Sequence, residues 1–204
     1  MNILNGCKAS LLNRLALNFF RSVLFSLVVS IVLSAALPTA TLADEFQFSY
    51  PITGANAQEL IDQIQDNTHS PDGAFGYTEL NTKVGWTATV SPDGVCSVVK
   101  VDFSYDITIY MPQWVDRDKA KACLQKNWDL VWYEIQVHEE QHRKLYRLLD
   151  VEDIKSRIAA IRPRASCGVL KSAINAEVEM ILDENDKLHD KFHAASASPM
   201  LSDC

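Results

Sequence analysis

The chain has 204 residues, with 26 acidic against 19 basic side chains, and its formal net charge at pH 7 is −7. This acidic balance argues against nucleic acid as a partner, because proteins that bind phosphates cluster lysine and arginine on one surface. Beyond an N-terminal targeting segment, the remaining length fits a single domain with one sizeable hydrophobic core.

Residues 1–43 have the pattern of an export signal. Three basic side chains precede an apolar run over residues 23–37, and small residues follow it. This run is shorter than the roughly 20 apolar residues that span a bilayer, so we expect cleavage; an uncleaved membrane anchor is the alternative. Cleavage leaves 16 basic against 26 acidic side chains, a net charge near −10. Residues 44–204 are therefore predicted to form one periplasmic or secreted domain without a stable membrane anchor.

A short helix and two strands are the first predicted elements of the mature chain. Asn56 followed by Glu59 has the form of a helix N-terminal cap, and the helix is expected to end near Asn67. Apolar and polar residues then alternate over 80–90 and 99–111, with a Ser-Pro-Asp-Gly turn between them. We expect an antiparallel hairpin. Its edge could bind an extended substrate, although the pattern fits a purely structural sheet equally well.

The rest of the chain has helical spacing. Helices are predicted over about 117–149 and about 151–161, and a last one ends near Phe192, after a break bracketed by Pro163 and Gly168. Strands followed by helices predict an α+β domain, with a small antiparallel sheet packed on helices.

The sequence His-Glu-x-x-His at 138–142 lies within the longest predicted helix. Residues four apart share one helix face, so His138 and His142 can reach a single zinc ion while Glu139 lies beside them. Zinc polarises a carbonyl and acidifies a water molecule, from which Glu139 would take a proton as general base. The pattern predicts a zinc-dependent peptidase.

These three residues also fall on the apolar stripe of the helix. Burying two imidazoles and a carboxylate is costly unless a partner satisfies them, and a metal ion would satisfy all three. Two core histidines bonded to backbone groups are the alternative. The full motif in register with a buried face favours the metal site. The apolar stripe consists of Trp128, Val131, Trp132, Ile135, Leu145, Tyr146 and Leu149.

A catalytic zinc usually has three protein ligands, so one more must come from elsewhere in the chain. Glu177 falls within the apolar stripe of the last helix and is the candidate from periodicity. The alternative is a buried glutamate paired with an arginine of the motif helix. His189, Asp190 and His193 are further candidates. The two histidines could bind metal or stabilise an oxyanion, or they could belong to a solvated helix end.

Four cysteines follow the export signal, an even number that predicts two disulfides in an oxidising compartment. Four cysteines allow three connectivities. We expect Cys123 to pair with Cys167, which would tie the start of the motif helix to the start of the last helix. Cys96 would then pair with Cys204. Free thiols are the alternative, and zinc ligation is disfavoured because there is no Cys-x-x-Cys pair.

Several short motifs follow one another in a specific order over most of the mature chain. They are Tyr50-Pro51-Ile52-Thr53-Gly54, the strand pair around Cys96, Met111-Pro112-Gln113-Trp114, Cys123 with Trp128, and the His138 to His142 motif. In this order the chain resembles the bacterial domain of unknown function 922, a family described as predicted secreted zinc-dependent proteases of the zincin-like superfamily. The resemblance implies a zinc site on His138 and His142, with Glu139 as general base.

The chain departs from the family pattern near its end, where a Tyr-Asp, a Thr and a His-Gly are expected. Residues 189–195 keep Asp190 but lack the later histidine and glycine. If that histidine serves chemistry, either His193 substitutes for it or the protein is impaired. Our leading interpretation is a zinc metallopeptidase acting on peptides or proteins. The alternative is a zincin-like binding or structural envelope protein without turnover.

Overall fold

The computed structural model describes residues 43–196 and 200–204. The predicted export signal therefore lies outside the described residues, apart from Ala43. Among the helices of the described part, none combines the length and the apolar character required to cross a membrane.

Three strands form one sheet in the order β1-β3-β2. The predicted hairpin is confirmed: β2 (Tyr77–Val90) pairs antiparallel with β3 (Cys96–Trp114), and Gly94 adopts a positive φ of 84° in the turn. A third strand, β1 (Asp44–Ile52), was not predicted and runs parallel to β3. Since β3 lies in the middle, β2 is an edge strand.

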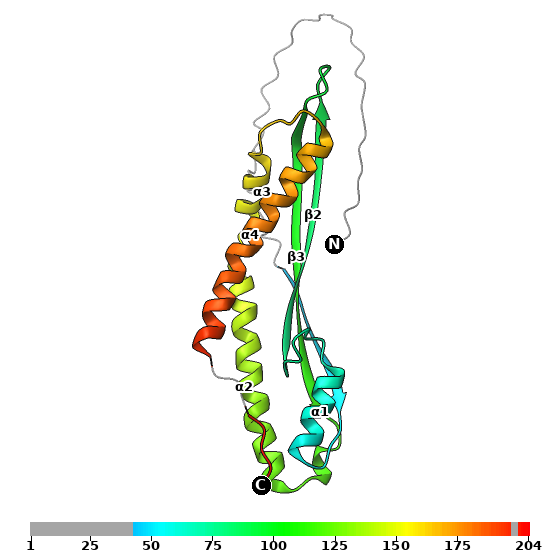
Figure 1. The fold of residues 1–204 in the computed structure, drawn as a ribbon, viewed down its shortest axis with the longest axis vertical. Helices are drawn as coiled ribbons and strands as arrows, with labels where there is room; N and C mark the ends of the chain where they lie inside the picture. The colour runs from blue at the N-terminus through cyan, green and yellow to red at the C-terminus, as the bar shows by residue number, and fades with distance from the viewer. Residues whose placement is uncertain (1–42, 197–199) are drawn as a thin grey trace, which may run out of the picture.

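The helices pack along the elongated hairpin, which gives a mixed α+β fold (Figure 1). The predicted cap of the first helix is confirmed, because the Asn56 side chain accepts a 3.0 Å hydrogen bond from the Glu59 backbone N–H. The long helix predicted from 117 is interrupted and starts five residues later. The helices are α1 (Ala57–Asn67), the short 3₁₀ helix η1 (Arg117–Lys119), α2 (Ala122–Tyr146), α3 (Val151–Ala159) and α4 (Cys167–Ala195).

Tryptophans fix α2 against the end of β3. Trp132 Nε1 donates a 3.1 Å hydrogen bond to the Pro112 carbonyl, and the rings of Trp114 and Trp128 meet edge to face at 5.8 Å. Around them lies a core between α1, α2 and the sheet, while a second core packs α3 and α4 on the far half of the hairpin. Together these contacts hold the motif helix in one orientation to the sheet.

Helix α4 runs from the hairpin turn back toward the middle of α2, and the C-terminal residues lie beside the start of α2 (Figure 1). The Asn127 side chain donates a 3.1 Å hydrogen bond to the Ser202 carbonyl, and Leu201 is buried in the core beside α2. The last turn of α4 meets the final third of α2, where the ring of His193 lies against those of His138 and His142.

The predicted cysteine pairing is wrong. Cys96 bonds to Cys167, and Cys123 bonds to Cys204. Cys123 lies in the first turn of α2, whose length of 25 residues corresponds to roughly 37 Å. Cys167 starts α4 at the opposite end of the molecule, beside the β2–β3 turn (Figure 1). Each disulfide thus joins segments that already lie at the same end.

Candidate metal centre

Four of the five histidines of the chain gather between α2 and α4. The ring of His142 lies 4.8 Å from those of His138 and His189 and 4.7 Å from that of His193, measured between centroids. Each helix contributes two histidines four residues apart, which share one helix face. His69 is the remaining histidine and lies against the sheet.

Three of these side chains offer a ligand set. One nitrogen each of His138, His142 and His193 lies within 4.8 Å of the other two. The Nε2 atoms of His138 and His142 are 3.1 Å apart. Zinc–nitrogen bonds of about 2.0–2.1 Å in a tetrahedron place ligand nitrogens about 3.4 Å apart. The pair on α2 is close to this spacing. His193, on the exposed last turn of α4, supplies the third nitrogen, so the donor set fits a three-histidine zinc site.

Burial keeps the inner imidazoles uncharged. Desolvation first, and then the like charges of the neighbouring histidines, lower the pKa of His142 to about 3. Desolvation is also the main cause that lowers the pKa values of His138 and His189. These three side chains are therefore neutral at pH 7, the state in which imidazole binds metal.

Glu139 faces the start of β2. The Thr78 hydroxyl shares its one hydrogen between Glu139 Oε2 at 2.7 Å and the Glu139 backbone carbonyl at 3.2 Å. A Cβ placed on Gly76 would lie 2.8 Å from Glu139 Oε1 and 2.5 Å from Ile135 Cγ2, so only glycine fits there. Glu139 is 5% exposed, and burial raises the pKa of its carboxyl group to about 7 against the opposing effect of the Thr78 bond.

The structure does not bring Glu177 into the ligand set, which corrects the prediction for the third ligand. Its Oε1 accepts a 2.8 Å hydrogen bond from Arg157 Nε on α3. Glu177 and His193 are 16 residues apart on α4, or roughly 24 Å along its axis. The alternative of a glutamate paired with arginine describes its contacts, although the partner comes from α3. His193 replaces Glu177 as the candidate.

The two other candidates of the last helix differ in position. Asp190 is exposed and lies outside the ligand set. His189 is buried behind His142, with its Nδ1 2.6 Å from His142 Nδ1, on the side of that ring opposite to His138. His189 therefore contacts a candidate ligand and is not part of the set itself.

A family model for bacterial proteins of unknown function (DUF922) matches residues 48–198. The chain belongs to the DUF922 family. The match extends from β1 to the residues just after α4 and includes all four clustered histidines. No curated protein and no solved structure matches the chain.

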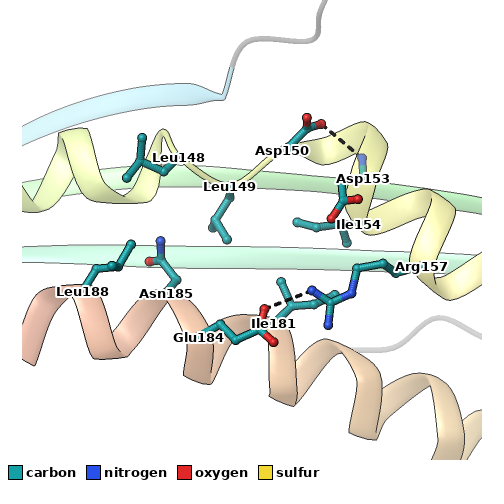
Figure 2. A pocket seen from close by; sticks show the side chains of 10 residues that line it. All are labelled: Leu148, Leu149, Asp150, Asp153, Ile154, Arg157, Ile181, Glu184, Asn185 and Leu188. Atoms are coloured by element: carbon teal, nitrogen blue, oxygen red, sulfur yellow. Dashed lines mark hydrogen bonds and ion pairs between the residues drawn. The ribbon is translucent and has the colours of Figure 1, made fainter.

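A cavity of the DUF922 chain lies next to the histidine cluster, between the α2–α3 junction, α3 and α4 (Figure 2). Three of its four charged side chains have structural partners. Asp150 caps α3 by accepting hydrogen bonds from two backbone N–H groups, and Arg157 pairs with Glu184 at 3.0 Å. Asn185 forms part of the wall. The cavity thus presents groups that stabilise helices, and the histidines remain the chemically distinctive site of the protein.

Three residues that contact the site were missed by the sequence analysis. Gly76 and Thr78 come from a stretch of β2 far from the motif, and no local pattern links them to Glu139. Asn185 is 5% exposed and faces the end of α2. A signal for it existed, because Asn185 stands four residues before His189 on the apolar stripe of the last helix.

Proposed function

We propose that this DUF922 protein is a zinc-dependent metallopeptidase of zincin-like type, exported to the periplasm or secreted. The supporting observation is that four of five histidines converge between two helices, with three ligand nitrogens within 4.8 Å. A buried carboxylate lies on the same helical turn as two of them. This combination is typical of metal-assisted hydrolysis.

His138, His142 and His193 would hold the zinc ion. When bound, zinc supplies Lewis-acid polarisation of the scissile carbonyl and a more acidic water molecule. Glu139 would act as general base, because its buried carboxylate lies on the same helical turn as His138 and His142. Thr78 would keep the carboxylate in place through Oε2 and leave Oε1 to accept the proton.

A peptide or protein is the substrate that suits this surface best. The edge strand β2 begins beside Glu139, and its free edge would pair with an extended peptide. The acidic net charge disfavours nucleic acid. Two disulfides are typical of proteins from oxidising compartments and agree with export. The apolar run of residues 23–37 would leave with the signal, so no stable membrane anchor is expected.

A binding or structural envelope protein without turnover is the second candidate. The observation that favours it is the C-terminal end of α4, where residues 189–195 depart from the family pattern and the third candidate ligand, His193, is exposed. A two-histidine site with a weak third ligand would bind metal less firmly and would lack the fixed geometry that catalysis requires.

Comparing Glu139→Gln with wild type on a mixed library of quenched fluorescent peptides tests the proposal. Loss of the general base should lower kcat/KM by about 10²- to 10⁴-fold while zinc content stays unchanged. Glu140→Gln is the matched control, because the adjacent Glu140 pairs with Arg143 and lies off the site. Equal activity in Glu139→Gln and wild type would eliminate the proposed base. A zinc-loaded wild type without activity would favour the second candidate.

A further inference from the structure

A line of buried polar groups connects the end of α2 to His142. It begins at the Leu145 carbonyl, which accepts a 3.0 Å hydrogen bond from Asn185 Nδ2. A carbonyl can only accept, so this bond fixes the orientation of the Asn185 amide. Its Oδ1 then faces His189 Nε2 at 3.2 Å. Because Oδ1 is an acceptor, His189 Nε2 must carry the hydrogen.

The same reasoning continues through the two imidazoles. A neutral imidazole carries one N–H, so His189 Nδ1 presents a lone pair. This atom lies 2.6 Å from His142 Nδ1, which must therefore be the donor. His142 Nε2 is left as a lone pair, and it faces His138 Nε2 at 3.1 Å within the ligand set. Each hydrogen bond in the line fixes the position of one hydrogen. Asn185 therefore determines the tautomer of His142 through His189.

Burial favours a single pattern of hydrogen bonds along this line. Asn185, His189 and His142 are 5%, 7% and 8% exposed, so solvent competes little for their hydrogen bonds. The Tyr146 ring packs on His189 at 4.2 Å between centroids and holds its plane. A buried polar group without its partner is costly, which favours the single arrangement that satisfies every member.

We propose that Asn185 and His189 are positioning residues that hold His142 in its Nδ1–H tautomer and thereby present its Nε2 lone pair to a metal ion shared with His138 and His193. The metal part of this inference rests on the proposed function; the tautomer part does not. In the opposite tautomer, the Nε2 hydrogen would occupy the place of the metal. Hydrogen bonds to the outer nitrogen of a ligating histidine commonly fix its tautomer and strengthen the site.

The tautomers can be measured directly in the metal-free protein. Long-range ¹H–¹⁵N correlation spectra of the exported protein, purified and treated with chelator at neutral pH, distinguish protonated from unprotonated ring nitrogens. We expect His142 in the Nδ1–H form and His189 in the Nε2–H form. The His142 result is diagnostic, because free imidazole side chains favour Nε2–H. Finding His142 in the Nε2–H form in wild type would overturn the proposal without any variant.

Two substitutions at Asn185 provide the causal test. Asn185→Leu removes the acceptor and should release the tautomer preference of both histidines. Asn185→Asp loses the bond to the Leu145 carbonyl but keeps an acceptor of the same size for the His189 Nε2–H, so it should retain the preference. Unchanged tautomers in a folded Asn185→Leu protein would overturn the role of Asn185. Glu184→Gln is the matched control, since Glu184 is the neighbouring residue, lines the same cavity and pairs with Arg157 (Figure 2).

Zinc affinity, measured by competition with a chromophoric chelator, tests the consequence for the metal. Asn185→Leu should bind zinc about 10- to 100-fold more weakly at unchanged stoichiometry, whereas Asn185→Asp and Glu184→Gln should stay near wild type. Equal affinity in all four proteins would overturn the metal part. A wild type with the expected tautomers and no zinc would instead contradict the proposed function, so the two failures are distinguishable.

Discussion

Two parts of α4 use polar side chains in different ways. In the part that faces α3, Glu177 and Glu184 both pair with Arg157, so carboxylates meet a cation supplied by α3. In the last two turns, His189 and His193 meet the histidines of α2, and within the described residues none of these imidazoles forms an ion pair. The first group is complete as it stands. The second consists of imidazoles whose nitrogens can bind a metal ion, so a metal site is proposed there.

The two disulfides sharpen this comparison, because one lies at the start of α4 and the other lies in the C-terminal segment that follows α4. Cys167 starts the helix, whereas Cys204 ends the tail that follows His193. Replacing either pair by serines, Cys96 with Cys167 or Cys123 with Cys204, should lower the free energy of unfolding by about 4 kcal/mol. Chemical unfolding measures this loss. Zinc affinity should fall only in the variant without the Cys123–Cys204 bond. An equal fall in both variants would show that the tail does not support His193.

Glu139 on α2 lies on the histidine side of this comparison, and within the described residues it forms no ion pair. Its effect on stability should therefore depend on pH. Its folded-state pKa of about 7 exceeds the usual value of 4.5, so the folded protein retains a proton that the unfolded chain loses between these values. Stability from this group is therefore lost as pH rises from about 4.5 to 7. Relative to wild type, metal-free Glu139→Gln should gain about 3 kcal/mol between pH 4 and pH 8.

Urea unfolding of both proteins across this pH range measures the difference, and the contribution of the shared histidines cancels. Added zinc at pH 8 should reduce the gain of the variant, because a nearby cation lowers the pKa of the carboxyl group. A difference that does not change with pH would mean that Glu139 titrates normally and is not held in a desolvated position.

The smallest effect is expected in the part of α4 that is already neutralised. Glu177→Gln breaks one partly exposed ion pair with Arg157, while Glu184 remains as a partner. The free energy of unfolding should fall by no more than about 1 kcal/mol, and zinc affinity should not change. Thermal unfolding and the chelator assay measure both quantities. A large loss of zinc would return Glu177 to the list of ligands and contradict the comparison.

Local patterns predicted much of the fold. The Asn56 cap and the alternation in the hairpin are set by neighbours in the sequence, and they were read correctly. The strand β1 was missed, although Phe46, Phe48 and Tyr50 alternate with polar residues. Its partner is β3, more than 50 residues away and in parallel orientation, and sequence alternation alone does not specify that pairing.

Periodicity predicted the buried residues of the candidate site best. Periodicity placed Glu139 and His142 on an inward face, and both are buried. The same criterion selected Glu177, because it searches for polar residues on an apolar stripe, and it gave no priority to the exposed His193. The cysteine pairing failed for a related reason. It depends on which ends of two helices meet, a long-range property that cysteine spacing does not contain.

Zinc stoichiometry of the purified protein tests the central claim most directly. Wild type, His142→Ala and the control His69→Ala, which changes the one histidine outside the cluster, would be dialysed and measured by inductively coupled plasma mass spectrometry. We predict about one zinc ion per chain in wild type and in the control, and nearly none in His142→Ala. A folded wild-type protein that contains no zinc and does not take up added zinc would contradict the account.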